Sequence, residues 1–127
     1  LGLYVRCVSG YAKNDNKINN ILTSNHEWNI LKIDNIFYHI DSTWGAGFLK
    51  DGKFEKKFSE KYFCPEPELF IFTHYPLENR WQLISPNISS EEFFKRVKLD
   101  PFFFDLFKTD FIYHTIKVKN KTIIIKR

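Results

Sequence analysis

Two runs of residues with strand propensity, 26–33 and 36–43, are separated only by the dipeptide Asp34-Asn35. Asp and Asn tolerate the positive φ angles that a two-residue hairpin turn demands. The segment therefore predicts a β-hairpin, and a turn of this length also fixes which residues of the two strands face each other. No other feature constrains the fold as strongly, because the chain must build an antiparallel sheet around this hairpin.

The register of this hairpin brings chemically active side chains onto one face. Trp28 faces Asp41 and His26 faces Thr43, so the four residues share a face of the sheet. His26 and Asp41 become diagonal neighbours, with Cα atoms about 7–8 Å apart. A carboxylate bonded to one imidazole nitrogen fixes the tautomer and leaves the other nitrogen free as a base. The opposite face carries an apolar set that we expect to face the core: Leu31, Ile33, Ile36, Tyr38 and Ile40.

Shorter strand signals occur elsewhere in the chain. A β-prone run at residues 3–8 is predicted to end at Ser9-Gly10, and residues 50–61 are predicted to form a charged, exposed connection. The end of the chain predicts two strands around a turn at Lys119-Asn120-Lys121. The further predicted strands are 81–84, 113–118 and 122–126.

Two short helices are predicted from their first residues. One begins at Pro65-Glu66-Pro67-Glu68, since proline and acidic residues suit the first turn of a helix, and Pro76 is predicted to stop it. The other follows a capping box made by Ser89 and Glu92. Its apolar face is predicted to consist of Phe93, Phe94 and Val97.

Composition and charge narrow the classes of protein and partner. Hydrophobic residues make up 43% and charged residues 27%, as in ordinary globular domains. No apolar run reaches the ~18–20 residues that a membrane span needs. The net charge of +4 comes with lysines that are interspersed with acidic residues, and no nucleic-acid-binding motif accompanies them. We therefore expect neither nucleic acid nor a membrane as a partner.

The two cysteines, Cys7 and Cys64, are too few for a disulfide scaffold and favour a reduced, cytoplasmic setting. Cys7 lies within a predicted strand, without the helix amino terminus that lowers the pKa of a thiol, and both cysteines are interpreted as buried and structural. The chain contains no methionine, so Leu1 is not the start of a reading frame. We expect the chain to be a fragment.

The other histidines do not complete a metal site. A zinc-binding helix motif would need a second histidine where Ile30 stands, and His39 lacks the Cys or His company of a zinc site. His74, near a predicted helix end, is interpreted as structural. No metal and no cofactor are expected. On spacing alone, the His–Asp pair also fits an ordinary polar contact, and Trp28 fits ordinary packing.

Several segments share the order and spacing of a known family. Two surround the hairpin: His26-Glu27-Trp28-Asn29 and Ile40-Asp41-Ser42-Thr43-Trp44-Gly45-Ala46-Gly47. The others are Val8-Ser9-Gly10-Tyr11-Ala12-Lys13, Tyr62-Phe63, Pro67-Glu68-Leu69-Phe70-Ile71, His74-Tyr75-Pro76 and Trp81-Gln82-Leu83-Ile84. This ordered set, spanning residues 3–101, resembles the transglutaminase-like superfamily, with the kyphoscoliosis-peptidase family as its nearest branch.

The resemblance implies a fold of the α+β class. Residues 1–105 would form a papain-like, transglutaminase-like core with an antiparallel sheet, incomplete at its N-terminus. Residues 106–127 would form a short β extension, the start of a β-sandwich module.

The resemblance also implies Cys–His–Asp acyl transfer on protein glutamine or peptide amides. His26 takes the place of the base, Asp41 orients it, and Trp28 walls the site. Glu27 stands where the family has a small residue, but it points away from His26 across the pleat. The family's nucleophilic cysteine lies on a helix before the strand at 3–8, so this chain alone is expected to be inactive.

Two functions stay open at this point. The first is an enzyme, with water or an amine as the acyl acceptor. The second is a non-catalytic scaffold module. The implied partner is a protein substrate or a cytoskeletal protein, in the cytoplasm or associated with the cytoskeleton. The uncovered sheet edge at 3–8 is expected to favour self-association.

Overall fold

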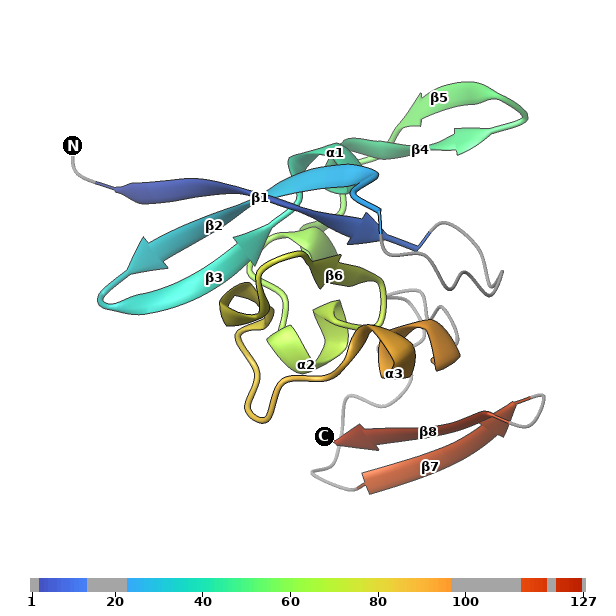
Figure 1. Cartoon of the computed structure of the whole chain (residues 1–127). Helices are drawn as coiled ribbons and strands as arrows, with labels where there is room; N and C mark the ends of the chain where they lie inside the picture. The colour runs from blue at the N-terminus through green and yellow to red at the C-terminus, as the bar shows by residue number, and fades with distance from the viewer. Residues whose placement is uncertain (1–2, 14–22, 97–112, 119–120, 127) are drawn as a thin grey trace.

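A computed structural model describes residues 3–13, 23–96, 113–118 and 121–126, and its centre is a four-stranded antiparallel sheet (Figure 1). The strands lie in the order β3-β2-β1-β6, and short helical segments surround them. The predicted antiparallel sheet is confirmed. The strands of this sheet are β1 (Tyr4–Ala12), β2 (His26–Ile33), β3 (Ile36–Ile40) and β6 (His74–Pro76). The other elements are β4 (Gly47–Lys50), β5 (Lys53–Lys56), β7 (Tyr113–Val118), β8 (Lys121–Lys126), α1 (Ser42–Ala46), α2 (Pro67–Phe70), α3 (Ser90–Lys95), η1 (Glu60–Tyr62) and η2 (Asn79–Gln82).

The β2–β3 hairpin has the predicted turn and register. Asp34 and Asn35 have φ angles of 50° and 66°, and Ile33 pairs with Ile36 across the turn. The second strand, however, is shorter than predicted, since β3 ends at Ile40 and α1 begins two residues later. The placement of Thr43 on the strand face beside His26 is therefore wrong, because Thr43 lies within α1.

The hairpin buries its Trp28 face, and the predicted core set is buried only in part. Trp28 and Ile30 are 2% and 0% exposed. Of the predicted set, Leu31 is buried, Tyr38 and Ile40 are half-buried, and Ile33 and Ile36 are 41% and 55% exposed. The reason lies outside the hairpin. Side chains from β1, α2 and η2 pack on the Trp28 face and bury it: Val8, Phe70 and Trp81. The polar pair and the apolar core consequently share one face of the sheet.

Strand β1 continues through the glycine that was predicted to end it. A Cβ on Gly10 would lie 2.4 Å from the Tyr75 carbonyl oxygen and 2.5 Å from the Trp28 ring. Gly10 pairs with His26 on one side and with Pro76 on the other. Glycine is required here because β6 and the Trp28 ring approach the backbone closely, and not because the strand stops.

Three other predictions need correction. Residues 50–61 were predicted to form a connection, but they include most of the β4–β5 hairpin. Its turn has positive φ angles at Asp51 and Gly52. The Asp-Gly pair is a hairpin signal, which the prediction missed because the segment is rich in charged residues. Residues 81–84 do not form a strand, since η2 is a 3₁₀ helix. Pro76 does not stop α2, which ends at Phe70, and belongs to β6 instead.

The remaining elements agree with the predictions where they are described. Ser89 caps α3 by accepting a hydrogen bond from the Glu92 backbone, and Phe93 and Phe94 are buried. Val97 and the predicted domain boundary between residues 105 and 106 lie outside the described residues. Strands β7 and β8 form the predicted terminal hairpin. Among the described residues, no helix has the length and apolar character that a membrane crossing requires.

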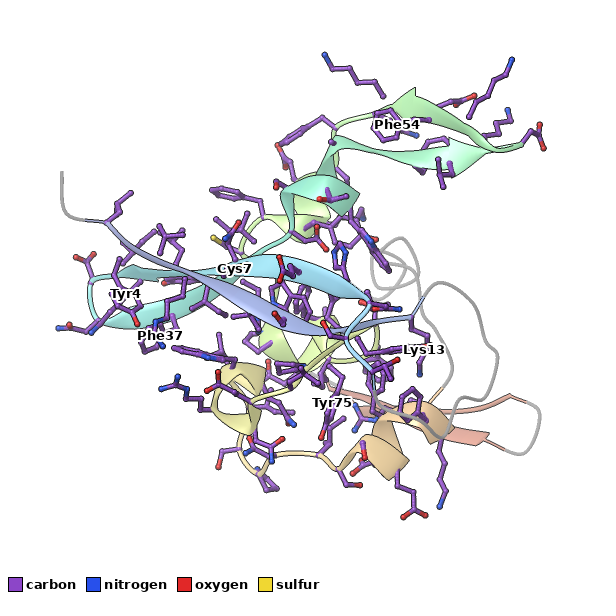
Figure 2. All side chains as sticks on the ribbon, turned by 45° about the horizontal axis from the view of Figure 1, so that its top comes forward. Tyr4, Cys7, Lys13, Phe37, Phe54 and Tyr75 are labelled. Atoms are coloured by element: carbon purple, nitrogen blue, oxygen red, sulfur yellow. The ribbon has the colours of Figure 1, made fainter. Side chains whose placement is uncertain are left out.

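A buried lysine joins the end of β1 to α3 (Figure 2). Lys13 is 2% exposed, and its Nζ donates to the carbonyl oxygens of Phe93 and Arg96, at 2.7 Å each. The same ammonium lies 4.3 Å from the centroid of the Phe93 ring. A cation at the carboxyl end of a helix adds a charged donor to its last carbonyl groups and complements its dipole. Lys13 thereby fixes α3 against the sheet.

The close approach at Gly10 predicts a large cost for a single methyl group. Gly10→Ala is expected to lower the free energy of unfolding by about 2–3 kcal/mol, because the Cβ would overlap the Tyr75 backbone. Ser9→Ala, at the neighbouring position on the other face, is expected to cost less than about 1 kcal/mol. Urea unfolding followed by circular dichroism measures both, and equal stability of the two variants would contradict this packing.

The buried lysine predicts a second difference in stability. Lys13→Met keeps the apolar stem but leaves the two helix-end carbonyls without their charged donor, so we expect a loss of about 2–4 kcal/mol. Lys95→Met is the matched control, since Lys95 is exposed on α3 and pairs only at the surface with Glu91. This variant should leave the midpoint of thermal unfolding almost unchanged. Thermal unfolding would show the contrast.

Candidate functional site

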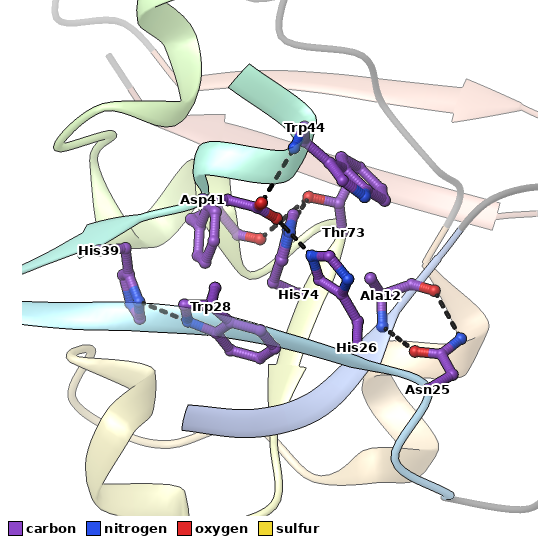
Figure 3. A network of polar contacts seen from close by, with 10 residues as sticks. Ala12, Asn25, His26, Trp28, His39, Asp41, Trp44, Thr73 and His74 are labelled. Atoms are coloured by element: carbon purple, nitrogen blue, oxygen red, sulfur yellow. Dashed lines mark hydrogen bonds and ion pairs between the residues drawn. The ribbon is translucent and has the colours of Figure 1, made fainter. Parts of the chain in front are cut away.

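Three side chains from separate elements meet on the buried face of the sheet (Figure 3). His26 is the first residue of β2, Asp41 is the N-cap of α1, and His74 is the first residue of β6. His26 Nε2 lies 2.6 Å from Asp41 Oδ2, and His74 Nε2 lies 2.8 Å from the same oxygen. One carboxylate oxygen is thus shared by two imidazoles.

The end of η1 and the start of α1 together hold Asp41 in place. Its backbone N–H donates to the Tyr62 carbonyl oxygen at 2.9 Å, and its Oδ1 accepts from the Trp44 N–H at 3.0 Å. The side chain is 1% exposed. Burial alone would raise the pKa of Asp41, but the hydrogen bonds from His74, Trp44 and His26 outweigh it and hold the pKa below its ordinary value. The carboxylate is therefore ionised at neutral pH.

His74 is buried completely and is neutral at neutral pH. Burial lowers its pKa to about 4, although the contact with Asp41 opposes that shift. Its Nδ1 lies 2.7 Å from Thr73 Oγ1, and its ring stacks on Phe70 with centroids 3.9 Å apart. Because an ionised carboxylate only accepts hydrogen bonds, we assign the single ring proton of His74 to Nε2. The Thr73 hydroxyl also lies 3.3 Å from the Phe70 carbonyl oxygen, and we assign its one proton to the shorter contact with His74 Nδ1.

His26 keeps one ring nitrogen available. Its side chain is 15% exposed, and because Nε2 donates to Asp41, Nδ1 is the nitrogen left to accept a proton. The Trp28 ring stacks at 6.2 Å and the Trp44 ring lies 5.8 Å away, measured between centroids. Trp28 is itself fixed, since its Nε1 donates to His39 Nδ1 at 3.1 Å. The arrangement is suited to proton transfer at Nδ1 of a partly exposed imidazole.

The same three groups have a composition that could hold a cation. One ligand atom from each of His26, Asp41 and His74 lies within 4.8 Å of the other two. The two N···O distances are those of hydrogen bonds, and each group has its partner within the cluster. The arrangement is therefore complete as a hydrogen-bonded network, and we assign no metal to it.

Neither cysteine of the chain has the features of an activated nucleophile. Cys7 is exposed and not buried as expected, because it lies on the face of β1 opposite to the core. Local desolvation, the Glu27 charge and the hydrogen bond from Cys7 Sγ to Glu27 raise the pKa of this thiol. Cys64 is half-buried, and burial raises its pKa as well. A raised pKa keeps a thiol protonated and unreactive.

Sequence reasoning brought His26 and Asp41 together but missed His74. The contact predicted from the hairpin is present in the structure, while the catalytic roles stay predictions. His74 was placed at a helix end, whereas β6 carries it to the carboxylate from 33 positions along the chain. No local signal predicts this strand, because Tyr75 is the only strand-favouring residue of His74-Tyr75-Pro76 and proline is depleted in strands. His39 is 1% exposed and contacts the ring of Trp28, so its role is in packing.

The buried imidazoles predict that acid destabilises the fold. Burial lowers the pKa of His74 to about 4 and that of His39 to about 3, so the unfolded chain takes up protons from pH 6.5 downward while the folded chain does not. Stability should therefore fall with pH, by about 2 kcal/mol for each histidine between pH 7 and pH 5.

Urea unfolding at the two pH values measures this loss. His74→Gln, which cannot titrate, should show a smaller loss between pH 7 and pH 5 than the parent chain. Equal stability of the parent at both pH values would contradict the burial of neutral imidazoles.

Parts of several known proteins are similar to this chain. No protein-family model matches the chain. The kyphoscoliosis peptidases of Mus musculus and Homo sapiens are each 37% identical over 70 residues, which cover 54% of this chain and 11% of each relative. The Lim and transglutaminase domain protein ltd-1 of Caenorhabditis elegans is 29% identical over 123 residues, covering 88% of this chain and 15% of that protein. The chain spans a small part of the length of each of these relatives, and it is a relative of the kyphoscoliosis-peptidase branch of the transglutaminase-like proteins.

Proposed function

We propose that His26 and Asp41 are the acid–base pair of a cysteine-dependent acyl transfer within a papain-like, transglutaminase-like domain. The observation that carries this proposal is the 2.6 Å contact between His26 Nε2 and the buried Asp41 carboxylate, with Nδ1 left to accept a proton. This is the relation between base and orienting carboxylate that nucleophilic catalysis requires. The names of the relatives, a peptidase and a transglutaminase-domain protein, support the same chemistry.

The nucleophile in this proposal is a cysteine outside these 127 residues. Its thiol proton passes to His26 Nδ1, and the thiolate attacks the carbonyl carbon of a glutamine side chain or a peptide bond. The tetrahedral intermediate collapses with cleavage of the C–N bond, and His26 returns the proton to the leaving ammonia or amine. Water or a primary amine then attacks the thioester, His26 takes its proton, and the cysteine is released.

The surroundings of the pair support these roles. Asp41 is ionised and held by several hydrogen bonds, so it keeps the His26 ring in one orientation and stabilises the imidazolium that forms. The Trp28 and Trp44 rings lie beside His26 and limit the access of water to it. Low polarity around a charge pair strengthens its interaction. The substrate in this proposal is a protein.

A second candidate is a non-catalytic module that binds another protein, with a cytoskeletal protein as the proposed partner. It is favoured by apolar side chains that remain exposed on the described part of the sheet. Leu3 and Val5 of the first strand region are 66% and 55% exposed, and Ile36 on β3 is 55% exposed. Exposed apolar surface of this kind marks interaction sites. Loss of activity in the variants below would separate the enzyme from this module.

The proposal predicts a specific loss of activity in protein expressed from the complete reading frame that encodes these residues. His26→Ala should lower kcat/KM for amine incorporation or peptide hydrolysis by about 10²–10⁴, because positioned proton transfer contributes that factor. Asp41→Asn should act in the same direction, since the amide no longer stabilises a charged imidazole.

Glu27→Gln is the matched control. Glu27 is next to His26 in the sequence, but its side chain lies on the opposite, exposed face of the sheet, where it contacts Ser9 and Cys7. Incorporation of a fluorescent amine into casein and release of amine from a peptide library measure the two reactions. Unchanged turnover in His26→Ala would overturn the proposal, whereas no turnover in the parent protein would favour the binding module.

A further inference from the structure

We propose that His74 is a positioning residue of this site, which holds the Asp41 carboxylate in the one orientation where Oδ2 also meets His26. The proposal rests on the proposed function of the His26–Asp41 pair and deepens it by adding a third residue. A pair on one hairpin would leave the carboxylate with a single imidazole partner. The structure instead gives the carboxylate a second imidazole, from a strand on the far side of β1.

The hydrogen bonds around the carboxylate define its orientation. Oδ1 accepts from the Trp44 backbone at 3.0 Å, and Oδ2 accepts from both His26 and His74, at 2.6 and 2.8 Å. The Trp44 bond fixes one oxygen only. Rotation about the bond to the carboxylate carbon could still move Oδ2 away from His26, and the His74 contact opposes that rotation. Three donors to two oxygens therefore fix the plane of the group.

The surroundings of His74 fix its ring in place and keep it from exchanging protons with solvent. Its side chain is 0% exposed, its ring lies flat on Phe70 with an angle of 14° between the planes, and its Nδ1 contacts Thr73. Both ring nitrogens thus have partners, and neither reaches solvent. The contacts with Phe70 and Thr73 fix the ring, and the fixed ring fixes the carboxylate, as residues behind the ligands do in metal sites.

His74 also moderates the charge that His26 meets. Among the described residues, the ionisable groups that contact the carboxylate are His26 from β2 and His74 from β6, and the Tyr62 ring of η1 lies 6.4 Å from the His74 ring. The neighbouring Trp28, Trp44 and Phe70 rings carry no charge. A neutral donor on Oδ2 draws electron density from the carboxylate without adding a charge.

Two substitutions separate the hydrogen bond from the packing. His74→Gln places an amide N–H near the position of Nε2 but removes the ring that stacks on Phe70. His74→Phe keeps a ring against Phe70 but removes the donor. If the donor positions the carboxylate, His74→Gln retains function and His74→Phe loses it. If packing alone matters, the order of the two variants is reversed.

A spectroscopic readout on the 127-residue chain does not require a nucleophile. In nitrogen-15 spectra of the histidine rings, the parent and His74→Gln should show His26 as the Nε2–H tautomer, with a hydrogen-bonded proton that exchanges slowly. His74→Phe should show a mixture of tautomers and faster exchange of that proton. The proposal is overturned by a His26 spectrum in His74→Phe that matches the parent, or by one in His74→Gln that is disturbed as much as in His74→Phe.

Activity in the protein from the complete reading frame gives the second arm. His74→Phe should lower kcat by about 10- to 100-fold with little change in KM, the factor expected for one hydrogen bond to a charged group. His74→Gln should restore most of that loss. A tautomer change without any turnover in the parent would reject the proposed function and keep the role of His74. Turnover that is equal in the parent and in His74→Phe would reject the role of His74 alone.

Discussion

The buried carboxylate of Asp41 is the group on which the arrangement of this chain depends. Asp41 directly follows β3, and its carboxylate caps the first turn of α1 and accepts hydrogen bonds from imidazoles on β2 and β6. A charge in the interior is tolerated only where donors replace the water that it has lost, and here the donors come from three elements. The helix cap, the sheet and the site therefore belong to one hydrogen-bonded network, and a substitution of Asp41 would remove bonds from all three.

What the sequence predicted correctly depended on local signals. Asp34-Asn35 specifies a turn through its own backbone preferences, and Ser89 caps α3 through a hydroxyl three residues from its partner. The contact of His26 with Asp41 follows from that turn, because a two-residue loop fixes the pairing of the flanking strands. These inferences needed no knowledge of the rest of the chain.

The errors arose where distant segments decide the outcome. The apolar pattern of the hairpin favoured one face, but Phe70 and Trp81 from outside the hairpin bury the other. Gly10 resembled a strand end, whereas the reason for glycine is the approach of Tyr75 across the sheet. Such contacts join residues that lie tens of positions apart, so periodicity and turn propensity carry no information about them.

Strand β6 gives the site a weak point of its own. It is three residues long, and within the described part of the chain it pairs with the end of β1 alone and lies at the edge of the four-stranded sheet. Short edge strands open in local fluctuations that leave the interior strands paired. Each such opening withdraws His74 from the carboxylate while the hairpin that carries His26 stays intact. The free energy of opening β6, and not the global free energy of unfolding, therefore determines how much of the time His26 and His74 both contact Asp41. Amide protection along β6 measures that local free energy.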